Sequence, residues 1–102
     1  MFRASARLLD CRITLFTRWN CSLCDTAKSV VQNVKTLRPF EYQEINVMDR
    51  GQEKWKAVYE FDTPVIHIDK SGSGHTTTSA RKLMHRFKED EVAKVMDEVE
   101  RI

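Results

Sequence analysis

Two cysteines three positions apart, Cys21 and Cys24, constrain the fold of this 102-residue chain more than any other feature. A β-rich apolar run over 13–16 precedes them, and a run with helical periodicity follows them. At such a strand-to-helix junction, the first thiol lies where backbone N–H groups point outward and the helix dipole favours a thiolate. The second thiol lies about one turn later, within reach of a disulfide. The spacing therefore predicts a redox pair in which the pKa of Cys21 is below that of a free thiol.

The first half of the chain predicts two strands and two helices. In order, these are a strand over 11–16, a helix over 23–37, a strand over 40–47 and a short helix over 52–60. The long helix is indicated by apolar residues that recur at spacings of three and four, from Leu23 to Leu37. Asn20 is its expected N-cap, and Pro39 prevents it from continuing. Cys21 is therefore expected at the N-terminal edge of this helix, and Cys24 within its first two turns.

The second half predicts a β-hairpin and a final helix. Its elements are a strand over 65–68, a flexible loop over 70–79, a strand over about 82–87 and a helix from about residue 90. Leu83, His85 and Phe87 alternate, and the helical stripe that starts at Val92 does not continue back through them. A strand that forms a hairpin with the preceding one is therefore favoured over an extended final helix.

The resulting order, β-α-β-α-β-β-α, defines an α/β fold. The first two strands are joined by a helix and must therefore be parallel, while the final hairpin adds an antiparallel edge. We expect a four-stranded mixed sheet with helices on both faces. A chain of this length forms one small domain, so residues 1–102 are assigned to a single domain.

Composition argues against several classes of function. The formal net charge is +2, which gives no strong electrostatic case for binding nucleic acid or an acidic membrane. No apolar run approaches the length needed to span a bilayer. Three cysteines are an odd count, so one redox-active pair in a reducing compartment is favoured over a disulfide framework. The remaining cysteine, Cys11, is expected to be a buried, small apolar residue.

The N-terminal segment, residues 1–10, has two open interpretations. Its first nine residues carry Arg3 and Arg7 and no acid, which is typical of a short mitochondrial targeting peptide. Alternatively, the segment is a disordered basic N-terminus, and the protein is cytoplasmic.

The element order, the cysteine pair and the step Thr63-Pro64-Val65 together resemble the glutaredoxins. More specifically, the chain is similar to a glutaredoxin-like branch of the thioredoxin fold, with the closest match over 15–24, Leu-Phe-Thr-Arg-Trp-Asn-Cys-Ser-Leu-Cys. The resemblance extends from about residue 13 to the C-terminus and implies one glutaredoxin-like domain with a thioredoxin/glutaredoxin-like fold.

The resemblance also implies roles for individual residues. Cys21 would be the nucleophile and Cys24 the resolving thiol. Arg18 would be the basic residue that precedes the nucleophile, and two interpretations of it stay open: it stabilises the Cys21 thiolate, or it is simply solvated. Pro64 would be cis and face the two thiols, and the backbone of Thr63 would pair with a bound peptide or with glutathione.

The chain departs from the glutaredoxin pattern in three places. Ser22-Leu23 replaces the usual Pro-Tyr or Pro-Phe between the cysteines, and Thr63 directly precedes the proline. The Gly-Gly turn that helps hold glutathione is absent, and residues 86–90 occupy that region. The fold and the thiol chemistry are compatible with these changes, whereas specificity for glutathione does not follow.

The leading hypothesis is an enzyme, a thiol–disulfide oxidoreductase in electron transport that reduces disulfides or glutathionylated proteins. Glutathione is then a candidate co-substrate, no bound cofactor or metal is expected, and the protein is expected to be a monomer. The alternative is a non-enzymatic thioredoxin-fold module that binds a partner protein or an iron–sulfur cluster through the same cysteines. A zinc site is disfavoured because zinc takes four ligands and the chain has no second cysteine pair.

Aromatic side chains outside the cysteine pair have less specific interpretations. His67 lies in an apolar run and is expected to be a hydrogen-bonded core histidine rather than a ligand. Neither His75 nor His85 has an acid–base partner nearby in the sequence. For Trp19 two interpretations stay open: a wall of the substrate groove, or an aromatic residue without a role in binding.

Overall fold

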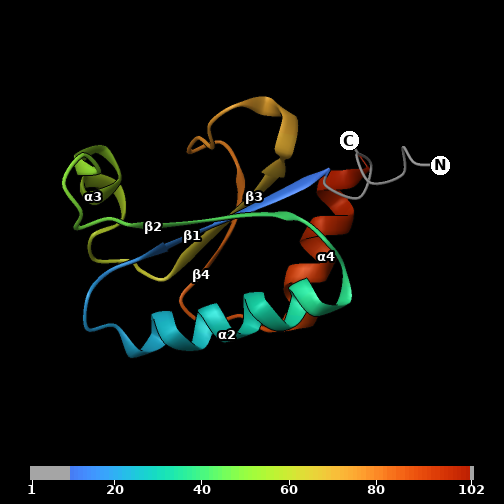
Figure 1. Ribbon diagram of the computed structural model, residues 1–102, viewed down its shortest axis with the longest axis horizontal. Helices are drawn as coiled ribbons and strands as arrows, with labels where there is room; N and C mark the ends of the chain where they lie inside the picture. The colour runs from blue at the N-terminus through green and yellow to red at the C-terminus, as the bar shows by residue number, and fades with distance from the viewer. Residues whose placement is uncertain (1–9, 102) are drawn as a thin grey trace.

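The computed structural model describes residues 10–101, which form one mixed sheet and three α-helices (Figure 1). The strands are β1 (Cys11–Thr17), β2 (Glu41–Asn46), β3 (Val65–Lys70) and β4 (Arg81–Met84). The helices are α2 (Ser22–Leu37), α3 (Glu53–Tyr59) and α4 (Glu89–Glu100), with a 3₁₀ turn, η1, at Ser71–Ser73. The expected order of strands and helices is confirmed. The predicted targeting segment falls almost entirely on residues 1–9, which lie outside the described range.

The sheet has the strand order β2-β1-β3-β4. β1 is parallel to β2 and antiparallel to β3, and β4 forms the expected antiparallel hairpin with β3. The central strands are buried along most of their length, whereas the edges are more exposed and carry charge. The β2 edge bears Glu41 and Glu44, and the β4 edge bears Arg81 and Lys82.

Helices cover both faces of the sheet, and each face has its own core. Cys11, Ile13 and Leu15 of β1 point to the face covered by α2 and α4, where the core is mostly aliphatic. It also includes Ala27, Val30, Val31 and Val34 of α2, Ile66 and Ile68 of β3, and Val92, Val95, Met96 and Val99 of α4. Phe16 belongs to a second core on the face covered by α3 (Figure 1), together with Val47, Tyr59 and Val65.

The core under α3 is aromatic and contains a buried histidine. The Phe16 ring centroid lies 4.6 Å from that of Trp55, 5.1 Å from that of Tyr59 and 4.7 Å from that of His67. His67 is fully buried, and its Nε2 and Nδ1 lie 2.6 Å from Tyr59 Oη and 2.9 Å from Thr76 Oγ1. Burial, with a smaller contribution from Lys82, lowers the pKa of His67 to about 4, so the ring is neutral at pH 7. The expectation of a hydrogen-bonded core histidine is confirmed.

The Ser-, Gly- and Thr-rich loop is attached to the sheet by polar contacts. Arg12 of β1 forms two hydrogen bonds with Asp69, of 2.9 Å from Nε and 2.8 Å from Nη2, and also donates to the Gly74 carbonyl. Thr76 binds His67 in the aromatic core. β3 continues through Lys70, so the connection to β4 begins later than the sequence indicated.

The predicted strand over 82–87 is wrong at its C-terminal end, because β4 stops at Met84. His85 adopts a left-handed backbone conformation, with φ of +65°, and its N–H donates to the Pro64 carbonyl over 2.8 Å. Phe87 is buried against the α2–α4 core, which it reaches from the connection to α4 rather than from a strand. The tertiary hydrogen bond to Pro64 thus coincides with the end of an alternating pattern that looked continuous in the sequence.

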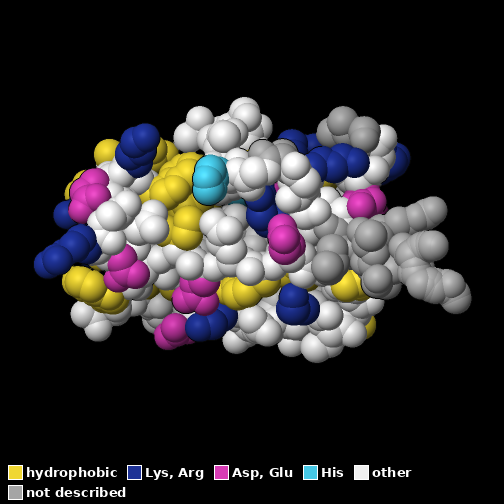
Figure 2. All heavy atoms as spheres, turned by 45° about the horizontal axis from the view of Figure 1, so that its top comes forward, with side chains coloured by type: hydrophobic (Ala, Val, Ile, Leu, Met, Phe, Trp, Pro, Cys, Tyr) yellow, Lys and Arg dark blue, Asp and Glu magenta, His cyan; other side chains and the backbone are white. Residues whose placement is uncertain are grey.

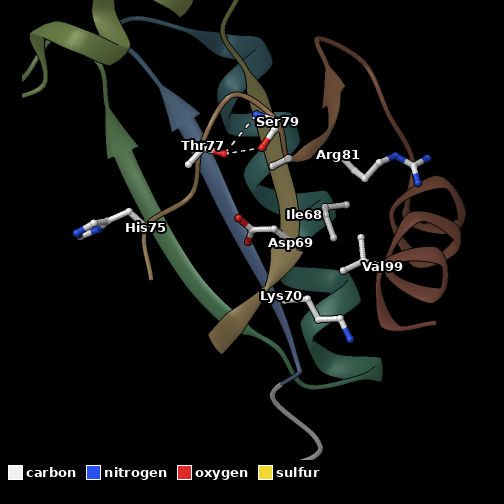
Figure 3. A pocket seen from close by; sticks show the side chains of 9 residues that line it. Ile68, Asp69, Lys70, His75, Thr77, Ser79, Arg81 and Val99 are labelled. Carbon is white, nitrogen blue, oxygen red and sulfur yellow. Dashed lines mark hydrogen bonds between the residues drawn. The ribbon is translucent and has the colours of Figure 1, made fainter. Parts of the chain in front are cut away.

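A hollow of about 400 Å³ lies at the end of the sheet where β1 begins and β3 ends (Figure 3). Ile68 and Val99 give it an apolar side. Two of the charged residues that line it form ion pairs within the chain, Arg81 with Glu98 at 2.7 Å and Asp69 with Arg12 at 2.8 Å. This end of the sheet is thus stabilised by internal charge pairs.

Within residues 10–101, no helix has the length and apolarity needed to span a membrane.

Candidate active site

The cysteine pair lies at the start of α2, and Cys21 itself caps the helix. β1 ends at Thr17, and the chain turns through Asn20, which adopts a left-handed conformation with φ of +54°. Cys21 is extended, and its Sγ accepts a hydrogen bond from the Cys24 N–H at 3.1 Å. The prediction of Asn20 as N-cap is therefore wrong by one residue. Asn tolerates the left-handed turn better than most residues, and the sulfur of Cys21 takes the capping position instead.

Cys21 and Cys24 form a disulfide with a Cα–Cα distance of 5.2 Å, which is within the normal range for such bonds. Cys21 is partly exposed, whereas Cys24 is 4% exposed and packs inside the first turn of α2. A thiol or thiolate from solvent can therefore approach the sulfur of Cys21 more readily than that of Cys24. This asymmetry is the one that separate attacking and resolving thiols require.

A hollow of about 430 Å³ opens beside Cys21. Two stretches of chain form its walls, the segment 18–23, which includes the first cysteine, and the segment with Glu60, Phe61 and Thr63; Met48 also lines the hollow. The structure thus places Arg18 and Thr63, two of the residues singled out in the sequence, around the same hollow as Cys21.

Arg18 connects the two walls of this hollow. Its Nη1 donates a hydrogen bond of 3.1 Å to the backbone carbonyl of Glu60, just after the end of α3. The sequence suggested a role beside the Cys21 thiolate, and the contact in the structure is with Glu60. Arg18 therefore acts first as a brace between the segment before Cys21 and the segment before Thr63.

Thr63 and Pro64 lie between α3 and β3, and the peptide bond between them is cis, as the resemblance implied. Pro64 is buried, and its carbonyl accepts the hydrogen bond from His85. Thr63 is partly exposed, and within residues 10–101 its backbone N–H and C=O have no hydrogen-bond partner. A bound chain in an extended conformation can pair with these two groups.

Large apolar side chains surround the exposed face of Cys21. Trp19 is 59% exposed and Phe61 is 87% exposed, and both line the hollow. Trp19 is therefore exposed beside the groove rather than packed in the core. Hydrophobic side chains are visible between charged ones at the end of the molecule that carries α3 (Figure 2).

Phe61 and Met48 line the hollow but belong to no sequence motif. A signal for Phe61 was available in the sequence. This large apolar residue lies between the short helix and the Thr63-Pro64 step, outside any helix or strand whose buried face would explain an apolar side chain. Met48 follows the parallel strand β2, whose C-terminal end lies beside that of β1. Its position at the same end of the sheet as Cys21 depends on that pairing.

A second hollow, of about 390 Å³, adjoins the first through Leu23. It runs between α2 and the β4–α4 connection, where the Gly-Gly turn of glutaredoxins was absent from the sequence. Arg86 and Lys88 line it, and both are exposed. His85 lies at its rim, with Nε2 3.8 Å from Asp62 Oδ1.

The third cysteine lies away from this site. Cys11 begins β1, is fully buried, and has its Sγ 3.7 Å from the Met96 carbonyl. Burial, and then the nearby charge of Glu100, raise the pKa of Cys11 to about 12. The described part of the chain, residues 10–101, contains no group of three or more His, Cys, Asp or Glu side chains positioned to hold a metal ion.

Comparisons with known proteins agree with the geometry. The sequence pattern of the family described as Glutaredoxin-like domain (DUF836) matches residues 12–97. Among solved structures, the protein XcR50 from X. campestris superposes with a TM-score of 0.61 at 19% identity, over 84% of this chain and 96% of that one.

Two thioredoxins superpose over a similar share of the chain. A mutant thioredoxin from Halobacterium salinarum NRC-1 gives a TM-score of 0.70 at 16% identity, over 92% of this chain and 78% of that one. Thioredoxin O2 from Arabidopsis thaliana, in an oxidized state, gives 0.62 at 14% identity, over 94% and 83%. At these identities the likeness establishes a thioredoxin-like fold.

Proposed function

We propose, since this chain belongs to the glutaredoxin-like domain family, that it is a thiol–disulfide oxidoreductase that reduces disulfides or glutathionylated proteins. The observation that carries the proposal is the Cys21–Cys24 disulfide at the start of α2, with Cys21 accessible and Cys24 buried. A structural disulfide would gain from burial of both sulfurs, whereas an exchanging disulfide needs one that is open to attack.

The chain's own residues supply the exchange chemistry. In the reduced protein, the thiolate of Cys21 attacks one sulfur of the substrate disulfide; that S–S bond breaks, and the other substrate sulfur leaves as a thiolate that takes a proton from solvent. Cys24 then loses its proton and attacks the sulfur of Cys21. The second substrate sulfur leaves, and two electrons have passed from the cysteine pair to the substrate.

The start of α2 favours the first step. The Cys24 N–H that points at Cys21 Sγ, and the positive end of the helix dipole, both stabilise negative charge on that sulfur. Arg18 contributes by joining the two walls of the groove through its bond to the Glu60 carbonyl. Reduction of the resulting disulfide needs an external electron donor, for which we propose glutathione.

Turnover of a small glutathione mixed disulfide tests this proposal. The reaction is followed with either glutathione plus glutathione reductase or thioredoxin reductase as the source of electrons. We expect turnover with glutathione and little with thioredoxin reductase. Turnover with thioredoxin reductase but not with glutathione would still support an oxidoreductase, with thioredoxin reductase instead of glutathione as the source of electrons. A protein that is inactive with both donors, or that is purified with the visible absorbance of an iron–sulfur cluster, would favour the binding module.

A further inference from the structure

We propose that Trp19 and Phe61 form an apolar clamp that selects polypeptide disulfides with an apolar residue next to the reacting cysteine. This inference rests on the proposed oxidoreductase function and names its substrate class. The preferred substrate is thus a disulfide in an extended or unfolded protein segment rather than glutathione disulfide.

The first argument is the exposure of the two rings. Phe61 is 87% exposed and Trp19 is 59% exposed, although apolar side chains of this size are usually largely buried. Neither belongs to the two cores of the sheet. Both line the hollow beside Cys21, one from each of the two stretches of chain that form its walls. A substrate side chain between them would remove apolar surface of both rings from water, which favours apolar neighbours of the substrate cysteine.

The second argument is the backbone next to the clamp. Within residues 10–101, the N–H and C=O of Thr63 have no partner, and this residue lies two positions after Phe61. An extended chain that pairs with Thr63 advances about 3.3 Å per residue, so the residues on either side of its cysteine pass along the wall of the hollow. A polypeptide has side chains at these positions, whereas the short glutathione molecule has little apolar surface to offer the rings.

The third argument is charge. Within the described range, Arg18 is the only cation that lines this hollow, and one of its N–H groups is used by the Glu60 carbonyl. Glu60 lines the hollow as well and adds a negative charge. The carboxylates of glutathione therefore find weak electrostatic support here, while a neutral apolar residue is not disfavoured. The Arg18–Glu60 bond also fixes the two walls relative to each other, so the clamp is present before the substrate binds.

Two peptide disulfides that differ only beside the cysteine provide the test. In one, Phe flanks the cysteine on both sides; in the other, Ser does; glutathione disulfide is the third substrate. Wild-type protein is compared with Phe61→Ser and with Leu37→Ser. Leu37 is a matched control because it is 80% exposed at the other end of α2.

We expect the wild type to reduce the Phe-flanked peptide about tenfold more efficiently, in kcat/KM, than the Ser-flanked one. Phe61→Ser should remove most of this preference, so that the two peptides react with similar kcat/KM. Leu37→Ser should preserve the preference. Equal rates for the two peptides, or a preference that survives Phe61→Ser, would overturn the clamp while leaving the oxidoreductase intact.

A single-turnover measurement separates the clamp from the choice of electron donor. The reduced Cys24→Ser protein is mixed with each disulfide, and formation of the mixed disulfide on Cys21 is timed by mass spectrometry. Faster formation with the Phe-flanked peptide supports the clamp. If no disulfide reacts with Cys21, the proposed function and the clamp both fail; if all react equally fast, only the clamp fails.

Discussion

Cys11 and Cys21 belong to the same β1–α2 unit, ten positions apart, yet their surroundings differ in every respect that controls thiol reactivity. Cys11 begins a central strand, is fully buried, and lies near the negative charge of Glu100. Cys21 is partly exposed at the N-terminus of a helix and accepts a backbone hydrogen bond on its sulfur. The first environment disfavours a thiolate and the second favours it.

The comparison teaches that burial and the neighbouring charges and N–H groups, rather than the residue type, determine how strongly each site favours a thiolate. Within β1, the alternation of the strand turns Cys11 toward the aliphatic core with Ile13 and Leu15. Beyond β1, the left-handed turn at Asn20 brings Cys21 out of the sheet and onto the start of α2. One strand thus begins with a buried thiol and leads, past its end, to the thiol that we propose reacts with substrate.

The largest expected difference is in disulfide turnover, between the variant that lacks Cys21 and the variant that lacks Cys11. Cys21→Ser is expected to reduce disulfide turnover to the uncatalysed background, because it removes the sulfur that forms the first covalent bond. Cys11→Ser is expected to leave kcat/KM of the folded protein within about twofold, and to lower the free energy of unfolding by about 1–3 kcal/mol through burial of a hydroxyl. Steady-state kinetics and urea unfolding measure the two effects. Equal losses of activity in both variants would contradict the assignment of Cys21 to the exchange reaction and of Cys11 to the core.

Removal of the buried partner of Cys21 should change the product rather than the attack. Cys24→Ser leaves Cys21 at the helix start, so the first exchange still occurs, but nothing within the pair resolves it. After incubation with glutathione disulfide, the mass of most molecules should rise by one glutathionyl group, located on Cys21 by peptide mapping. If Cys21→Ser acquires the same adduct on Cys24 just as readily, then the assignment of attacking and resolving roles is wrong.

Alkylation of the fully reduced, folded protein should reveal the contrast without any substrate. With the pKa of Cys11 raised to about 12, its thiolate fraction at pH 8 is on the order of one in ten thousand, and burial also blocks the reagent. We expect Cys21 to react at least about a hundredfold faster than Cys11 at pH 8. All three thiols should react at similar rates in concentrated denaturant. Rapid labelling of Cys11 under native conditions would mean that the start of β1 opens.

The smallest expected effect is the pH dependence of stability that His67 gives to the core under α3. The folded-state pKa of His67, about 4, lies below the 6.5 of an unperturbed histidine, so the unfolded chain binds more protons between these values. The contribution of His67 to stability is therefore complete above pH 6.5. It decreases by at most about 1.4 kcal/mol per pH unit as pH falls from 6.5 toward 4.

Urea unfolding of the wild type, His67→Gln and His75→Gln at several pH values measures this slope. The His67 variant should lose part of the pH dependence, whereas His75→Gln, in the exposed loop, should retain it. An unchanged slope in His67→Gln would assign the acid sensitivity to other groups. Since His67 is the one buried histidine of residues 10–101 and its ring packs against Phe16 in the core under α3, the loss of structure at low pH should begin on that side.

Features with a local sequence signal were predicted well. The spacing of Cys21 and Cys24, the periodicity of α2 and the Thr63-Pro64 step each depend on a few neighbouring residues, and the element order follows from such signals. The fold class was therefore within reach of the sequence, including the hairpin of β3 and β4.

Features that depend on tertiary contacts were not predicted. The end of β4 at Met84 coincides with the bond from His85 to Pro64, a partner 21 positions earlier. Phe61 follows Glu60, whose carbonyl accepts a hydrogen bond from Arg18 across 42 positions, so its place beside Cys21 accompanies a tertiary contact. Propensity and periodicity carry no information about such pairs, so the wall of the groove that carries Phe61 could only be seen in the structure.

The charged edges of the sheet have a consequence for crowded solutions. Open strands can recruit a strand from another molecule and begin aggregation. Here a strand added beside β2 would lie along Glu41 and Glu44 and disturb the Lys28–Glu44 pair, and one added beside β4 would meet Arg81, which is paired with Glu98. Two copies would also meet like charge at like edges. The protein therefore exposes apolar rings and the backbone of Thr63 at one end of its sheet, while the charges on its edges disfavour pairing of β2 with β2 or of β4 with β4 between two copies.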